Sequence, residues 1–271
     1  MGVVGDFIDY SINEDGTGTI ENIFPRNNYI SRKAPRIKGA SYRGERLEQI
    51  IASNIDNLFI VTSITRPDFN NRALDRILVT GESSHVKIFI IINKSDLDEQ
   101  NEIAHWKNLY EGIGYEVIVS SVKEGIGLDE IHTDLRNKTN LFWGSSGVGK
   151  SSILNNLFPH FELRTGEISD FSGKGIHTTV TSILLRVEDN TYLIDTPGVR
   201  EIDPYGLKKE DLGHYFVEFA PYLQNCRFST CTHDHEPGCG IFTAVEQGSI
   251  TKERYDSYLK ILNTIEDDMV Y

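Results

Sequence analysis

The chain has 271 residues, a hydrophobic content of 39% and a formal net charge of −13. This length allows two or three domains with a core of ordinary size, and the acidic balance argues against general adhesion to nucleic acids. The mean hydropathy is −0.32, and no apolar run approaches the ~18 residues that a membrane span needs. The first residues lack the basic start and apolar stretch of a signal peptide. We therefore expect a cytoplasmic protein without membrane contact.

The N-terminal residues 1–52 show short strand patterns at 5–12 and 17–23, on either side of a Glu-Asp-Gly turn. Short strands separated by turns are typical of a small β-barrel. The segment offers few strands for one, so we expect an incomplete barrel at the start of this chain.

A basic stretch follows, with seven basic residues and one acidic residue between positions 26 and 46, a local charge of +6 (seven minus one). In an acidic chain this pattern indicates a surface for a polyanion, although a solvated loop is the alternative. The predicted RNA contacts are Arg32, Lys33, Arg36 and Lys38.

Residues 53–205 alternate between strand and helix patterns. The runs at 57–64 and 86–92 are almost continuously apolar, as expected of strands covered on both faces. Helices are predicted at 70–80, 102–112, 128–135 and 150–157, and further strands at 116–120, 140–143, 180–187 and 191–194. This alternation predicts a parallel, doubly wound α/β sheet.

A glycine-rich segment lies between the strand at 140–143 and the helix at 150–157, the context that a P-loop requires. Its backbone N–H groups would surround the phosphates, Lys150 would reach the β- and γ-phosphates, and Ser151 would ligate Mg²⁺. The strand-helix context favours this interpretation over a chance glycine-rich loop. The predicted nucleotide contacts here are Gly144, Ser145, Ser146, Gly147, Val148, Gly149, Lys150, Ser151 and Ser152.

The sequence Asn-Lys-Ser-Asp ends the strand at 86–92 and matches the guanine-recognition element of GTPases. The Asp96 carboxylate can accept from both N1–H and N2–H₂ of guanine, which adenine does not offer. Asn93 would tie this loop to the P-loop, and the Lys94 stem would pack on the base. The alternative is an ordinary helix N-cap at Ser95 or Asp96.

Two further loops follow predicted strands. Ser120 and Ser121 fit the weak fifth GTPase element, whose backbone touches the guanine base. Asp195 begins Asp-Thr-Pro-Gly, where its carboxylate would hold Mg²⁺ and the Gly198 N–H would contact the γ-phosphate. Asp, Pro and Gly are also common in turns, so the alternative is an ordinary turn without a role in nucleotide binding.

The segment between the P-loop and Asp195 predicts a first switch in which Thr179 closes over Mg²⁺ and the γ-phosphate. Val199 stands where many GTPases have a glutamine that orients water, and valine cannot do so. We therefore expect slow basal hydrolysis, with His177 as the candidate base or positioning group beside Lys150 and Thr179. A structural loop histidine is the alternative for His177.

The five elements run in the order fourth, fifth, first, second, third, which is a circular permutation of the GTPase order. Each loop still leaves the carboxyl edge of the sheet, so the permutation keeps the same site in the folded protein. The third element now leads directly into the C-terminal residues 206–271, so we expect the nucleotide state to be transmitted to that region.

The C-terminal region is predicted to be helical at 207–223, 243–247 and 252–267, with all three cysteines of the chain in one loop between these helices. The spacing Cys226-x₄-Cys231-x-His233-x₅-Cys239 suits a closed tetrahedral zinc site of structural type. His235 is the competing nitrogen ligand.

The permuted motifs, the switch sequence His-Thr-Thr at 177–179 and the zinc spacing together resemble the RsgA (YjeQ, YloQ) family of small-ribosomal-subunit-dependent GTPases. Further matching stretches lie at 54–56, 66–70, 74–76, 164–169 and 233–239. The resemblance implies an N-terminal OB-fold, a permuted GTPase domain and a zinc domain whose ligands are Cys226, Cys231, His233 and Cys239. It also implies GTP and GDP binding, a late step in 30S maturation, 16S rRNA contacts from both flanking domains, and stimulation by the 30S subunit. We expect a monomer.

Two other functions fit parts of the pattern. A nucleotide-gated RNA-binding module with incidental hydrolysis would explain Val199. A metabolic P-loop ATPase would share the P-loop, but Asp96 argues against it.

Overall fold

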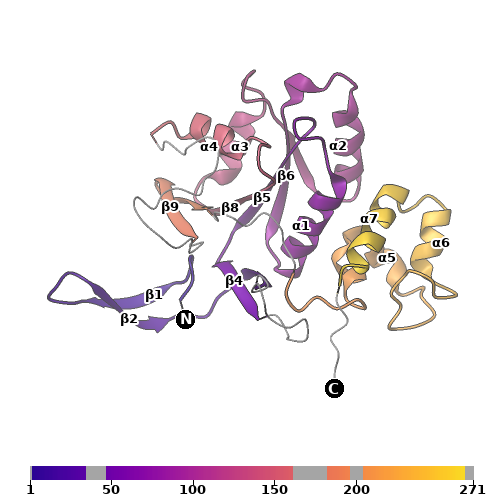
Figure 1. The fold of residues 1–271 in the computed structure, drawn as a ribbon, viewed down its shortest axis with the longest axis horizontal. Coiled ribbons are helices and arrows are strands. Elements are labelled where there is room, and N and C mark those ends of the chain that lie inside the picture. The colour runs from indigo at the N-terminus through magenta and orange to yellow at the C-terminus, as the bar shows by residue number, and fades with distance from the viewer. Residues whose placement is uncertain (1, 35–46, 161–181, 196–203, 266–271) are drawn as a thin grey trace, which may run out of the picture.

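The computed structural model describes residues 2–34, 47–160, 182–195 and 204–265, and of Asp195 it describes only the backbone. Figure 1 shows a central α/β body with strands of the N-terminal region below it and a helical C-terminal unit beside helix α1. Of the described residues, no helix is both long and apolar enough to cross a membrane.

The central body contains a six-stranded sheet in the order β7-β6-β5-β8-β10-β9. Its strands are β5 (Asn57–Ser63), β6 (Lys87–Asn93), β7 (Glu116–Val119), β8 (Thr139–Trp143), β9 (Ile183–Glu188) and β10 (Thr191–Asp195). Five strands are parallel, but β9 runs antiparallel to β10. The expectation of a fully parallel sheet is therefore wrong at this edge, because only Asp189 and Asn190 connect β9 to β10. Such a short connection permits only a hairpin.

Helices cover both faces of the sheet. Helices α1 (Asn71–Ser83) and α2 (Glu102–Gly112) cover one face, and α3 (Leu128–Leu135) and α4 (Lys150–Leu157) cover the other. Successive β5 residues alternate between the two cores, because side chains along a strand point to opposite faces. Leu58 and Ile60 join the core under α1 and α2, whereas Phe59 and Val61 join the core under α3 and α4. This arrangement confirms the doubly wound architecture.

The N-terminal region forms two antiparallel two-stranded sheets. The first pairs β1 (Ile8–Ile12) with β2 (Gly18–Ile23), and the second pairs β3 (Tyr29–Lys33) with β4 (Glu48–Ser53). Arg32 and Lys33 therefore belong to a strand rather than to the solvated loop that was the alternative. Ile30 anchors this strand, since its side chain is fully buried in the core that also contains β5.

The C-terminal unit consists of η2 (Leu212–Tyr215), η3 (Val217–Phe219), α5 (Ala220–Leu223), α6 (Gly240–Glu246) and α7 (Lys252–Leu262). The helical segment predicted at 207–223 is thus divided into three short pieces. Phe216, between η2 and η3, and Phe219 of η3 are fully buried and pack with Tyr258 of α7. Val79 of α1 belongs to the same hydrophobic cluster, so the C-terminal unit packs directly on the central α/β body.

Candidate nucleotide site and metal centre

The carboxyl ends of the parallel strands bring the predicted motifs to one edge of the sheet. The P-loop follows β8, the Asn-Lys-Ser-Asp element ends β6, and the serine pair follows β7. The backbone of Asp195 ends β10, which pairs with β8. Loops that are far apart in sequence therefore meet where nucleotides bind in open α/β sheets.

The P-loop wraps around the Lys150 side chain. Its ammonium group donates to the carbonyl oxygens of Gly144 and Ser145, at 2.6 and 2.9 Å. Gly149 precedes α4 with a φ of +105°, and a Cβ there would lie 2.2 Å from the Asn93 Nδ2 atom. Only glycine permits both this conformation and this close approach.

Asn93 joins three of the motifs. Its Nδ2 group donates to the carbonyl of Val148 at 2.9 Å, which confirms the predicted link to the P-loop. Its Oδ1 atom accepts from the Ser120 hydroxyl at 3.1 Å. Both side chains are buried, so the hydrogen bonds fix the spacing between the phosphate-binding and base-binding loops.

Asp96 is oriented by the loop after β7. Its Oδ1 atom accepts from the Ser121 hydroxyl at 2.7 Å, and its Oδ2 atom lies 3.4 Å from the Lys123 ammonium. The hydrogen bond from Ser121 lowers the pKa of the Asp96 carboxyl, and Lys123 adds to that effect. The carboxylate therefore stays ionised and can accept from a base.

Sequence reasoning missed the Ser121 and Lys123 side chains as partners of Asp96, because it assigned this loop a backbone role. It also left open a helix N-cap at Ser95 or Asp96. In the structure Lys94 precedes the short helix η1 (Ser95–Leu97), and it makes no side-chain cap. The N-cap alternative is therefore not what holds this loop.

Several residues that the sequence singled out fall in the parts of the chain that the structure does not describe. His177, Thr179, Gly198 and Val199 lie outside the described residues, as do Arg36 and Lys38. Arg32 and Lys33 lie together at the end of β3, where Arg32 Nε donates to Gln49 Oε1 of β4 at 3.1 Å.

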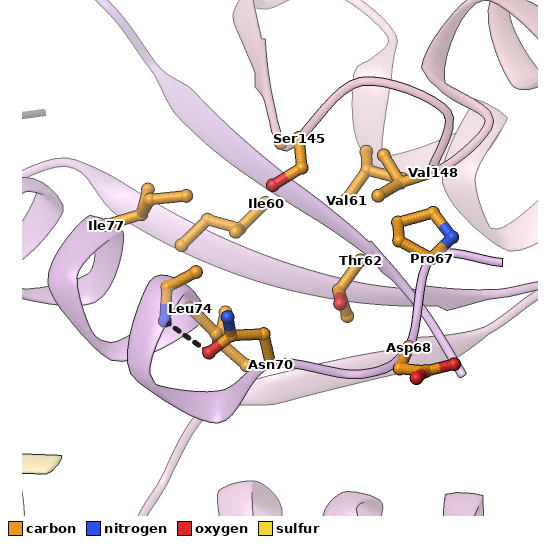
Figure 2. Close-up of a pocket in the computed structure, with 12 residues that line it drawn as sticks. Ile60, Val61, Thr62, Pro67, Asp68, Asn70, Leu74, Ile77, Ser145 and Val148 are labelled. Carbon is orange, nitrogen blue, oxygen red and sulfur yellow. Dashed lines mark hydrogen bonds between the residues drawn. The ribbon is translucent and has the colours of Figure 1, made fainter. Parts of the chain in front are cut away.

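A pocket of about 120 Å³ lies between the end of β5, the start of α1 and the P-loop (Figure 2). Leu74 and Ile77 of α1 line it, together with Ser145 and Val148 of the P-loop. Small-molecule sites usually enclose roughly 300 Å³ or more, so this space is too small to hold a nucleotide.

The predicted metal ligands converge in the C-terminal unit. The ligand atoms of Cys226, Cys231, His233 and Cys239 all lie within 4.8 Å of one another. The His233 Nδ1 atom lies 3.5 Å from the Cys226 sulfur and 3.4 Å from the Cys239 sulfur. A tetrahedral site with bonds of ~2.3 Å to sulfur and ~2.0 Å to nitrogen places these atoms roughly 3.5 Å apart. The group therefore fits a structural metal ion, whereas His235 is exposed and faces Asp234.

Backbone N–H groups donate to the sulfurs of two of the metal ligands. The N–H groups of Gly240 and Phe242 donate to the sulfurs of Cys226 and Cys239. Burial raises the pKa of Cys231 to about 12, so a thiolate at this position needs a cation.

Glu236 and two tyrosines of α7 fix the same loop. The Glu236 carboxylate accepts from the Thr232 N–H and hydroxyl at 2.7 and 2.6 Å. Burial raises the pKa of Glu236, but the hydrogen bonds from Thr232 outweigh burial and lower it to about 2. The hydroxyls of Tyr255 and Tyr258 donate to the carbonyls of His233 and Thr232, each at 2.7 Å. These contacts orient the metal ligands as outer-shell hydrogen bonds do.

The strand order, the P-loop and the linked base-recognition loop define a P-loop GTPase whose motifs are circularly permuted. Residues 23–205 match the family model described as RsgA GTPase. The chain belongs to the RsgA GTPase family, and its activity is GTP hydrolysis.

Individual relatives agree with this assignment. The chain is 38% identical to the small ribosomal subunit biogenesis GTPase RsgA of Chlorobaculum parvum, covering 97% of this chain and 85% of the relative. It is 39% identical to the protein of the same name from Phocaeicola vulgatus, covering 97% and 84%. The crystal structure of YjeQ from Thermotoga maritima is similar, with a TM-score of 0.77, 32% identity and coverage of 97% and 84%. YloQ, a circularly permuted GTPase, has a TM-score of 0.73, 27% identity and coverage of 100% and 83%.

Proposed function

We propose that this chain hydrolyses GTP during maturation of the 30S ribosomal subunit, which it binds through rRNA. The observation that carries this proposal is the joined base- and phosphate-binding site in a chain whose relatives are named small ribosomal subunit biogenesis GTPases. We further propose that the protein acts as a monomer in the cytoplasm.

Each predicted site residue has a proposed role in binding or hydrolysing GTP. Lys150 binds the β- and γ-phosphates, and Asp96 and Lys94 bind the guanine base. Ser151, Asp195 and Thr179 hold Mg²⁺. His177 supplies the group that acts on water, since Val199 cannot. The domains are residues 1–52, 53–205 and 206–271.

The metal in the C-terminal unit is proposed to be Zn²⁺. Three thiolates and one imidazole are ligands that this ion prefers, and they leave no position open for a substrate. The ion would therefore stabilise the loop of residues 226–239.

The rRNA contact is proposed to include Arg32 and Lys33 on β3. Replacing both by glutamate should weaken 30S binding roughly tenfold at physiological salt and flatten its salt dependence, because each contact releases counterions. The measurement is co-sedimentation with 30S and with 50S subunits over a range of salt, with a non-hydrolysable GTP analogue or with GDP.

Lys87→Glu with Lys107→Glu is the matched control, since it changes the formal charge equally at side chains of β6 and α2 that are 55% and 39% exposed. An equal loss of 30S binding in both double variants would show that the effect comes from net charge and not from Arg32 and Lys33. Failure of the wild-type chain to bind 30S subunits would refute the proposed function itself.

A further inference from the structure

A fully buried arginine lies at the boundary between the C-terminal unit and the GTPase body. Arg254 of α7 is 1% exposed. Its Nη1 group donates to the Asp75 carboxylate of α1, and its Nε group donates to Glu218 of η3 at 2.6 Å. The guanidinium also lies 4.4 Å from the Phe216 ring centre. One side chain therefore joins α7 to its own domain and to a helix of the other domain.

Asp75 depends on this contact. Its side chain is fully buried, and its Oδ1 atom also accepts from the Tyr110 hydroxyl of α2 at 2.7 Å. Among the described residues its Oδ2 atom accepts no hydrogen bond within ordinary distance. Two neighbouring contacts also hold α1 against the C-terminal unit. Arg76 donates to Thr264, and Val79 belongs to the C-terminal hydrophobic cluster.

The energetics favour a positional role over simple stabilisation. Removing an arginine and a carboxylate from water costs about as much as their attraction returns, so apolar side chains of equal volume would hold the two units equally well. The ion pair adds direction, because the planar guanidinium holds its N–H donors in a rigid fork toward the Asp75 and Glu218 carboxylates. The pair therefore specifies how α1 lies against α7.

Helix α1 also lies close to the P-loop, because both line the same small pocket. Leu74, next to Asp75, faces the pocket whose other wall is the P-loop (Figure 2). The loop before α1 is tied to the P-loop by Lys94, whose ammonium donates to the carbonyls of Arg66 and Gly147, the latter at 2.7 Å. A continuous set of contacts thus runs from Arg254 through α1 to the P-loop and to the guanine-recognition element.

We propose that Arg254 is a positioning residue for the nucleotide site, acting through Asp75 and α1, so that the C-terminal unit controls nucleotide release. This proposal rests on the proposed nucleotide site and adds a second route from that site to the C-terminal unit, separate from residues 196–203. In this proposal slower release means tighter nucleotide binding, and because binding couplings are reciprocal, nucleotide binding tightens the contact between α1 and α7.

The test compares two variants that each remove one negative charge next to Arg254. Asp75→Asn breaks the contact across the domain boundary, and Glu218→Gln breaks the contact within the C-terminal unit. Both proteins are first checked for folding and metal content. Release of a fluorescent GDP derivative should be about fivefold faster in Asp75→Asn and unchanged in Glu218→Gln. Equal release rates in wild type and Asp75→Asn would overturn the proposal, as would equal acceleration in both variants.

Hydrogen exchange on the wild-type chain gives a second readout that needs no folded variant. Adding GDP should slow amide exchange in α7 as well as in α1 and the P-loop. Protection limited to the P-loop and α1 would overturn the proposal. Absence of any GDP binding by the wild-type chain would instead overturn the nucleotide-site assignment on which the proposal rests.

Discussion

Replacing Asp96 by asparagine is expected to weaken GTP binding by roughly 10²- to 10⁴-fold, because a site built to hydrogen-bond a base rejects it strongly when one partner is mismatched. The asparagine amide has one acceptor, so its NH₂ group would oppose a guanine N–H donor. The same amide suits xanthine, which offers a carbonyl at C2 and a donor at N1. Affinity for xanthosine triphosphate should therefore rise as affinity for GTP falls.

The measurement is titration calorimetry with both nucleotides, and Lys123→Ala is the matched control. Lys123 is 75% exposed and contacts the same carboxylate, but it is not needed to accept from the base. Its removal should change GTP affinity by only a fewfold, since exposed ion pairs contribute little. Unchanged GTP affinity in Asp96→Asn would show that this loop does not recognise guanine.

Loss of the metal is expected to unfold the C-terminal unit. Structural zinc sites bind with about 10–16 kcal/mol, and that free energy is also folding free energy. In Cys231→Ser, a buried ligand becomes a hydroxyl that binds zinc poorly, so the metal content should fall well below one ion per chain. The transition of the C-terminal unit should then disappear from thermal unfolding followed by circular dichroism.

His235→Ala is the matched control for the zinc prediction. His235 belongs to the same loop, but its side chain is 81% exposed and does not join the cluster. This variant should keep one metal ion per chain and the wild-type unfolding transition. The metal assignment fails if Cys231→Ser retains full metal content, or if His235→Ala loses the metal instead.

The helices and strands that could be predicted from the sequence are those defined by the residue pattern within the segment itself. Helices α2, α3 and α4 begin and end at the predicted residues. The P-loop and the metal ligands were found because their spacing reflects a fixed geometry, and the structure brings each group together. Strand β3 was missed because its partner β4 lies beyond an intervening segment, so long-range pairing rather than local pattern defines it.

The contact of Arg254 with Asp75 and Glu218 was also not predicted, since a lone arginine on a helix normally lies in solvent. Its partners lie 36 and 179 positions away in the sequence. One local signal did exist: Arg254, Tyr258 and Ile261 share one helical face, and that face is buried. An arginine on a buried face must find carboxylates, but the sequence does not say which ones.

The most direct test of the account is the rate of GTP hydrolysis by the wild-type chain alone, with 30S subunits and with 50S subunits. Without a glutamine at position 199 the chain alone should be slow, and 30S subunits should accelerate turnover by roughly tenfold or more, as partners that complete a GTPase site do. The 50S subunits should not accelerate turnover. An equal rate in all three reactions would contradict the account and would make this chain a nucleotide-gated binding module instead.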